Sequence, residues 1–376
     1  MATATVPASR QSELTRPDQE RLFSLDLFRG VTIAAMIVVN NQSSESAYWP
    51  LRHAAWNGCT PTDLIFPFFL FIVGVSLVFS SHSRLERGYS RRALVLHALR
   101  RSAALFVIGL ALNGLGGLTL STWRIPGVLQ RIAIAYCVTT LITLFTKTPA
   151  RVAWIASLLL GYWMLLRFVP VPAYGLPLRD VALLHPNGNL AAYLDRSIMP
   201  GHLWEGTRDP EGMLSTLPAI ATTLFGVLAG EWLRSSRPAV KKLQGMFVCG
   251  LVGIIAGQVW GIWFPLNKKL WTSSYTVFTA GCAVIGLAAC YWASDIKRYR
   301  GAWSKPFVIF GTNAIAAYVI SELIGACLAW RGYTFLHSLA RLNSPALISL
   351  LHSFVVLILC FIPIWLLYRR TIFLKV

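Results

Sequence analysis

Charged side chains are too scarce in this chain of 376 residues to cover the surface of a soluble protein. Only 13% of the residues are charged, 55% are apolar and the mean hydropathy is +0.58, whereas soluble domains carry about 25% charged residues. Two buried cores would hold this many apolar residues, but their exterior would still need charge. Lipid must therefore be the solvent for much of the exterior, and the sequence predicts an integral membrane protein.

Ten apolar stretches are long enough to cross about 30 Å of hydrocarbon. Each must be helical, because a backbone in lipid has to satisfy its own hydrogen bonds. The predicted fold class is all-α, a polytopic membrane protein of about ten transmembrane helices. The stretches cover residues 25–41, 63–80, 95–114, 127–145, 150–169, 212–233, 243–264, 273–294, 306–328 and 346–368.

The distribution of Lys and Arg predicts the orientation of these helices. Of the 34 cations, 22 fall in the two terminal segments and in alternate connections, and ten fall in the remaining connections, although these are longer. The positive-inside rule then places both termini in the cytoplasm. The net charge of +19 follows this pattern, so it does not indicate a nucleic-acid partner.

The first 22 residues are polar and lack the apolar core of a signal peptide. We therefore expect a cytoplasmic tail at 1–22 and a membrane domain at 23–376. A connection at 170–211 is rich in Pro and Gly, lies outside in this topology, and is long enough to have a function or a small fold of its own. The seven cysteines show no CxxC or Cys/His spacing, so neither structural disulfides nor a metal site is predicted.

Two arginines stand inside apolar stretches, Arg29 in LDLFRGVTIAAM and Arg131 in IPGVLQRIAIAY. An arginine in a span costs several kcal/mol unless it meets a counter-ion or a polar cavity. Asp26 lies three residues before Arg29 on the same helical face, so a local ion pair is one interpretation. The other is that both arginines line a cavity for an anionic ligand such as a phosphate.

A polar connection follows the first predicted helix, NNQSSESAYWPLRHAAWNGCTPTD. His53 within it can exchange a proton near neutral pH, so it is either a general base or an ordinary loop histidine. Trp49 and Trp56 are typical of interfacial anchors.

Six blocks follow one another along nearly the whole chain: SLDLFRG (24–30), HAAWNGCTPTDLIFPFFLFIVG (53–74), GVLQRIAIAY (127–136), DPEGMLSTLPAI (209–220), FPLNKKLW (264–271) and PFVIFGTNAIAAY (306–318). In content and order they resemble the heparan-α-glucosaminide N-acetyltransferase family and its bacterial relatives, membrane acyltransferases that use acetyl-CoA. The second block, from His53 to the Asp-Leu-x-Phe-Pro run, is quite specific to that family.

The resemblance implies a reaction across a bacterial inner membrane, in which acetyl-CoA binds from the cytoplasm and its acetyl group reaches an amino sugar or glycan acceptor on the periplasmic side. It places the family's active-site histidine on His53 and an asparagine on Asn40. The segment between them is two residues longer than in the lysosomal members, so Asn41 is an alternative to Asn40. The resemblance also suggests a homodimer. The luminal domain and extra first span of the lysosomal members have no counterpart here, so the acceptor, and N- or O-acetylation, stay open.

Further positions in these blocks are predicted to bind the two substrates. The predicted acetyl-CoA residues are Asp26, Arg29, Arg131, Lys268 and Asn313, and the predicted acceptor residues are Asn57, Asp63, Asp209, Glu211 and Trp271. No metal is expected.

Two mechanisms fit these residues. In direct transfer, which we prefer, His53 takes the acceptor's proton as a general base and Asn40 stabilises the oxyanion. In the rival mechanism His53 carries the acetyl group covalently. The alternative from another class is a transporter or channel for an anionic solute; inverted repeats or paired broken helices would favour it, and the sequence shows neither.

Overall fold

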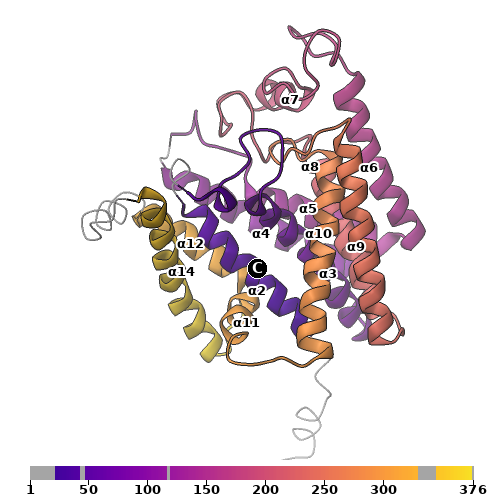
Figure 1. Ribbon diagram of the computed structural model, residues 1–376, viewed down its shortest axis with the longest axis vertical. Helices are drawn as coiled ribbons and strands as arrows, with labels where there is room; N and C mark the ends of the chain where they lie inside the picture. The colour runs from indigo at the N-terminus through magenta and orange to yellow at the C-terminus, as the bar shows by residue number, and fades with distance from the viewer. Residues whose placement is uncertain (1–21, 43–46, 117–118, 329–343, 375–376) are drawn as a thin grey trace, which may run out of the picture.

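The computed structural model describes residues 22–42, 47–116, 119–328 and 344–374, and within these ranges it contains helices and no strand (Figure 1). The predicted tail at 1–22 and the predicted connection at 329–345 fall almost entirely outside the described residues.

Nine helices in the described ranges are long and apolar enough to cross a membrane, which confirms the all-α polytopic class. Each matches one of the predicted stretches. They are α2 (Phe23–Asn40), α3 (Ile65–Glu86), α4 (Arg91–Asn113), α5 (Val128–Phe145), α6 (Thr148–Phe168), α8 (Thr216–Arg234), α9 (Ala239–Gly261), α10 (Ser273–Tyr291) and α14 (Pro345–Arg369).

The remaining predicted span, 306–328, is not one straight helix. It consists of α11 (Lys305–Thr312) and α12 (Ala314–Leu328), which meet at an angle of 91°. Asn313 at the break is buried, and its amide bonds the backbone of the C-terminal segment, donating to the Ile372 carbonyl and accepting from the Leu374 N–H. Counting this bent pair as one span gives ten.

Close helix packing forms the interior of the bundle. α3 packs along α8, α11 along α2, α4 along α5 and α9 along α10. Two glycines permit the first approach: a Cβ at Gly74 would lie 1.9 Å from the Thr223 carbonyl oxygen, and one at Gly226 would lie 2.0 Å from that of Phe71. Any larger residue at either position would force α3 and α8 apart.

The outer helices expose apolar side chains, as lipid contact requires. The exposed large residues of α4, α6 and α9 include Leu96, Val107, Val152, Met164, Phe247, Val252 and Ile255. By contrast, α2, α5 and α8 are mostly buried. The sites described below therefore lie in or at the ends of a central group of helices shielded from lipid.

Three connections meet at one end of the bundle, which is at the top of Figure 1. They are the α2–α3 connection with the short helices η1 (Trp49–Leu51) and η2 (Pro61–Leu64), the α9–α10 connection, and the predicted outside connection 170–211. The last contains α7 (Leu190–Ile198) and packs an apolar core of its own against α6. Trp56 donates to the Leu184 carbonyl and Lys269 to Glu205, so the three connections form one unit, the loop layer.

Candidate active site

His53 and Asp63 are paired in the loop layer. Nδ1 of His53 lies 2.7 Å from Oδ1 of Asp63, whose side chain is buried. The other carboxylate oxygen accepts hydrogen bonds from the N–H groups of Ala54 and Thr60 and from the Thr60 hydroxyl, each at 3.0 Å. Because these donors fix the carboxylate, it orients the imidazole through Nδ1. The His53 side chain is 46% exposed, so the ring keeps access to solvent.

The local sequence Thr-Pro-Thr-Asp places this carboxylate. Thr60 precedes η2, Pro61 occupies its first turn, and Asp63 reaches back to the Thr60 N–H as the acid of a capping box does. Tyr275 at the start of α10 donates to the Asp63 carbonyl at 2.5 Å. Asp63 was predicted to bind the acceptor substrate. In the structure it lies under the histidine, and all its contacts are inside the protein.

Lys268 approaches the pair from the α9–α10 connection. Its Nζ lies 3.0 Å from Nδ1 and 3.2 Å from Nε2 of His53, and 3.8 Å from Oδ1 of Asp63. Burial lowers the pKa of Lys268, and the Asp63 carboxylate opposes that shift. Asn57, which is exposed, accepts from the Asn267 side chain at 3.2 Å and so ties the two connections together.

Arg131 and Trp271 lie in the buried part of the same end. The guanidinium is 5.0 Å from the Trp271 ring, and its Nη2 donates to the Ser215 hydroxyl at 2.5 Å and to the Gly212 carbonyl at 3.2 Å. Its Nε and Nη1 are buried and have no partner among the described residues. Trp271 donates in turn to Thr222. A buried cation with two donors to spare is a rare and costly feature in a membrane protein.

Arg29 lies elsewhere, at a junction of α2, α3 and α11. It pairs with Asp26 at 3.1 Å, donates to the Gly311 carbonyl at 3.1 Å and to the Ser76 hydroxyl at 2.6 Å. The local ion pair that the sequence left open is therefore present. Arg29 is near the start of α2 and Arg131 near the start of α5, and these helices begin at opposite ends of the bundle, so the structure does not bring the two arginines together.

Asn40 and Asn41 differ in their surroundings. Asn41 is half-buried, and its side chain donates to the Ile37 carbonyl at 2.8 Å as an end to α2. Asn40 is exposed, and its Nδ2 donates to Oε1 of Glu322 at 3.4 Å. Asn40 is thus the residue with an accessible amide. Glu322 on α12 was not singled out as a site residue by the sequence, although a carboxylate within a span is a signal of function.

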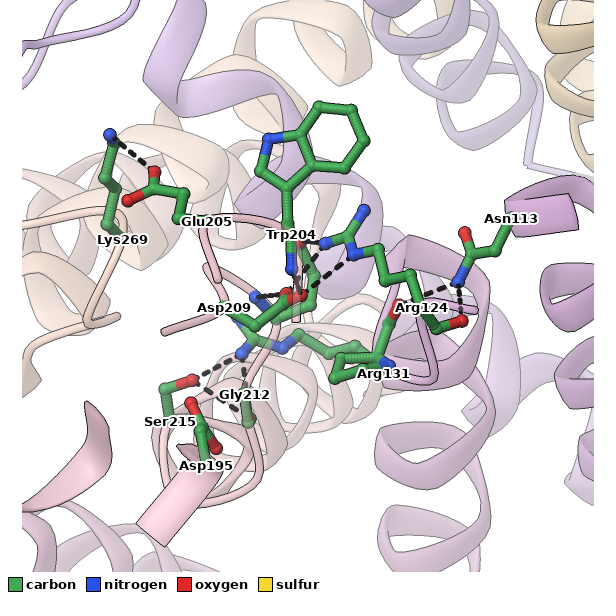
Figure 2. A network of polar contacts seen from close by, with 12 residues as sticks. Asn113, Arg124, Arg131, Asp195, Trp204, Glu205, Asp209, Gly212, Ser215 and Lys269 are labelled. Atoms are coloured by element: carbon green, nitrogen blue, oxygen red, sulfur yellow. Dashed lines mark hydrogen bonds and ion pairs between the residues drawn. The ribbon is translucent and has the colours of Figure 1, made fainter. Parts of the chain in front are cut away.

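Asp209 and Glu211 share Arg124 as their partner, and Figure 2 shows the contact between Arg124 and Asp209. Arg124 donates to both oxygens of Asp209, at 2.9 and 2.7 Å, and to Glu211 at 2.5 Å. Asp209 is fully buried and also accepts from the Trp204 N–H. Sequence reasoning counted Arg124 only as an outside cation; its place three residues before the GVLQRIAIAY block is the one signal of its importance.

Glu211 connects this network to the other groups. Besides Arg124, it interacts electrostatically with Arg131 and with Lys268. Figure 2 shows Arg124 directed at Asp209 and Arg131 directed at Gly212 and Ser215. The predicted residues His53, Asp63, Lys268, Arg131, Trp271, Asp209, Glu211 and Asn57 therefore gather at one end of the bundle, whereas Asp26, Arg29 and Asn313 lie away from it.

Asp195 on α7 supplies a pH-dependent contact in the loop layer. Burial raises the pKa of Asp195 to about 6, the Met213 N–H that it accepts opposes the shift, and the charge of Asp209 adds to it. A carboxyl whose folded-state pKa is raised contributes stability at low pH that is lost as the pH rises through about 6. We expect the stability of Asp195→Asn relative to the wild type to rise by about 1–3 kcal/mol between pH 4 and 6 and to change little above pH 6. Thermal unfolding in detergent at several pH values measures this, and parallel pH profiles would contradict it.

The comparison with known proteins covers most of these residues. Residues 21–258 match the family model for the catalytic region of heparan-α-glucosaminide N-acetyltransferase. The chain belongs to the heparan-α-glucosaminide N-acetyltransferase family. The mouse (Mus musculus) heparan-α-glucosaminide N-acetyltransferase is 32% identical over an alignment of 371 positions, which covers 84% of this chain and 56% of the relative. The human (Homo sapiens) protein is 33% identical over an alignment of 358 positions, which covers 81% of this chain and 53% of the relative.

This member of the heparan-α-glucosaminide N-acetyltransferase family thus spans just over half the length of the curated relatives it matches. The family match includes His53, Asp63, Arg131 and Glu211, and it ends before Lys268. In the described ranges no group of three or more His, Cys, Asp or Glu side chains is placed to hold a metal ion.

Proposed function

We propose that this chain is a membrane acetyltransferase that moves an acetyl group from cytoplasmic acetyl-CoA to an amino sugar or glycan on the periplasmic side of a bacterial inner membrane. One observation carries the proposal: a solvent-accessible histidine is held by a buried carboxylate, beside a lysine, at the polar end of a lipid-exposed helical bundle. The names of the family and of its relatives support N-acetyl transfer.

His53 acts on the acceptor. Acetyl-CoA supplies the acetyl group as a thioester. His53 accepts, at Nε2, the proton that the acceptor's amine or hydroxyl loses as its new bond to the acetyl carbon forms, because Nδ1 faces Asp63. Asp63 holds the tautomer and stabilises the imidazolium. As the carbon–sulfur bond breaks, His53 returns the proton to the thiolate.

Three groups are our candidates for stabilising negative charge on the acetyl oxygen. Lys268 holds its Nζ against both nitrogens of His53, beside the reacting atoms. Asn40 has an accessible amide, and one oxyanion donor contributes about 3 kcal/mol in well-studied enzymes. Nε and Nη1 of Arg131 are hydrogen-bond donors without partners among the described residues. We therefore keep Arg131 as a residue that binds acetyl-CoA, at its thioester end.

The acceptor would enter from the loop layer. Asn57 is exposed and Glu211 is partly so, and both can bind the hydroxyl or ammonium groups of a sugar. Asp209 and Trp271 are buried, so we propose that they position the acceptor site through Arg124 and Arg131. Asp26, Arg29 and Asn313 remain proposals for the donor's path nearer the other end of the bundle.

An anion transporter is the second candidate, and the bent pair α11–α12 is the observation in its favour. Transporters built from repeats carry such breaks in corresponding positions of both halves. The described residues contain one bent pair and no second. Arg29 also bonds to protein groups on three helices, which is typical of a residue that holds helices together. We therefore favour the enzyme.

Labelled acetyl-CoA tests the proposal. The full chain in nanodiscs is incubated with it and with amino sugars, cell-wall glycan fragments and lipid-linked sugars. We expect a labelled acetylated acceptor, and no labelled protein in the absence of acceptor. If, without acceptor, the wild-type protein became labelled and the His53→Ala variant did not, the mechanism would be covalent transfer through an acetyl-histidine and not direct transfer. The enzyme assignment would be overturned if the protein formed no acetylated product and also bound no CoA.

Replacing Asp63 by asparagine tests the pairing with His53. The amide preserves the size of the side chain but favours the wrong histidine tautomer, so we expect kcat to fall about 100-fold or more with little change in the KM for acetyl-CoA. The measurement is steady-state transfer to the best acceptor. A rise in KM with unchanged kcat would instead make Asp63 a substrate-binding residue, as the sequence suggested.

A further inference from the structure

Glu322 on α12 is a carboxylate within a span that the mechanism above does not use. α12 packs against α2 and α14 (Figure 1), and Oε1 of Glu322 accepts a hydrogen bond from Nδ2 of Asn40 at 3.4 Å. The carboxylate is also hydrogen-bonded to the side chain of Tyr318, one turn earlier on the same helix. Both partners are uncharged, and no cation among the described residues pairs with Glu322. A carboxylate within a span is costly, and it marks a functional group by default.

Glu322 belongs to the same group of side chains as the candidate active site. Tyr318 interacts electrostatically with both Glu322 and Glu211. Glu211 also interacts with Lys268, which contacts the histidine, and with Arg131. Nε and Nη1 of Arg131 are buried and have no partner among the described residues. Glu322 thus approaches from α12 a polar region that already contains unpartnered donors.

The charged groups on the neighbouring elements do not neutralise Glu322. Arg124 is already paired with Asp209 and Glu211. On α14, His352 is held by a backbone carbonyl at the end of α2. The halves of α2 and α4 nearer the loop layer contain no titratable side chain. Glu322 is therefore a carboxylate that a cationic ligand can bind through charge-assisted hydrogen bonds.

The proton balance of acetyl transfer to an amine requires two bases. Near neutral pH such an acceptor is mostly an ammonium ion, since amines of this kind titrate at about pH 8, as the α-amino group does. The ammonium ion and acetyl-CoA give the amide, CoA thiol and one free proton. The nitrogen thus loses two protons, and the first must leave before attack because an ammonium ion has no lone pair. His53 returns the second to the thiolate, so the first needs another acceptor. A hydroxyl loses only one.

We propose that Glu322 binds the ammonium group of an amine acceptor and takes its first proton, so that the chain acetylates nitrogen in preference to oxygen. This inference rests on the proposed function. An N–H bond breaks, the proton goes to a carboxylate oxygen of Glu322, and the electron pair stays on the nitrogen, which then attacks the acetyl carbon. The second proton follows the path through His53.

The surroundings of Glu322 suit this step. An ion pair is costly to hold away from water, and the transfer converts the ammonium and the carboxylate into two neutral groups. Once protonated, Glu322 no longer opposes the negative charge that Asn40 is placed to stabilise. Glu322 is partly exposed, so its proton can pass to solvent before the next turnover.

Glu322→Gln tests the proposal through its pH profile. Glutamine keeps the size of the side chain and can still accept from Asn40, but it cannot take the proton. The measurement is kcat/KM for glucosamine at saturating acetyl-CoA, from pH 6 to 9, on the full chain in nanodiscs. We expect the variant to be about 100-fold slower than the wild type at pH 6, where about one acceptor in a hundred is the free amine. The deficit should shrink as the pH rises and fall to about twofold or less at pH 9.

Two controls separate this role from a structural one. Glucose carries a hydroxyl where glucosamine carries its amine, so its slower acetylation should be the same in Glu322→Gln and in the wild type. Glu86→Gln removes an exposed carboxylate at the far end of α3 and should leave both acceptors unaffected. If Glu322→Gln folds poorly, Glu322→Asp carries the test: it should be slower than the wild type by the same factor at every pH, because a base is retained.

A loss in Glu322→Gln that is equal at every pH and for both acceptors would overturn the inference, because it would make Glu322 a structural residue. Wild-type rates in that variant from pH 6 to 9 would overturn it as well, and would leave the enzyme assignment standing. A deficit in Glu322→Asp that disappears at pH 9 would also contradict it. Absence of transfer by the wild type to any acceptor would instead overturn the proposed function, and the inference with it.

Discussion

His53→Ala is expected to lower kcat for acetyl transfer by about 100- to 10,000-fold, the usual contribution of a general base. The side chain is 46% exposed and its one carboxylate partner, Asp63, keeps three other donors. Removing the imidazole should therefore leave the fold and CoA binding intact. Steady-state transfer and calorimetry with CoA on the same preparation measure the two effects.

Added imidazole is the control for this prediction. A small base that diffuses into the vacated site should restore part of the rate in His53→Ala and none in Asp63→Asn, where the native ring still occupies the site. Activity within a few-fold of the wild type would show that His53 is an ordinary loop histidine, the interpretation that the sequence left open.

The second large effect is expected at Arg124. Arg124→Ala leaves the buried Asp209 carboxylate without its paired cation and removes the ion pair with Glu211, and breaking a buried pair from one side costs about 3–5 kcal/mol. Because Asp209 also holds the Trp204 N–H, we expect the loop layer to loosen, with a lower Tm and faster proteolysis within 170–211. Arg124→Lys should give an intermediate result, since lysine keeps the charge and loses the two parallel hydrogen bonds.

Arg179→Ala, in the connection 170–211 that Arg124 contacts through Asp209, is the matched control. Arg179 pairs with Asp180 through similar contacts, but its side chain is 74% exposed, and exposed pairs contribute little. We expect no measurable change in Tm. Equal effects of Arg124→Ala and Arg179→Ala would mean that burial of the Arg124 pair does not stabilise the loop layer.

The fold class and the helix positions could be predicted from the sequence because lipid leaves few options: a long apolar stretch with little charge must be a helix. The break at Asn313 could not, because residues 306–328 are apolar enough overall to be predicted as one continuous span. Its partners, Ile372 and Leu374, are about sixty residues away. Hydropathy contains no information about such a contact.

The sequence predicted which residues belong to the candidate site, but it did not predict most of the contacts between them. His53 and Asp63 stand in one block, but their pairing depends on how η2 turns the chain, and the approach of Lys268 joins segments 215 residues apart. The separation of Arg29 from Arg131 was open to prediction, since the first and fourth predicted helices run in opposite directions. The engagement of Asp209 by Arg124 required the folded connection 170–211.

The central claim is that donor and acceptor bind at opposite ends of one bundle, and sealed vesicles of known orientation test it most directly. Labelled acetyl-CoA is supplied on one side of the membrane and an acceptor that does not cross it is supplied on the other. The account predicts product only when acetyl-CoA is on the side of the membrane where α2 begins and the acceptor is on the side of His53. Product formed only when both substrates are on the same side would contradict it.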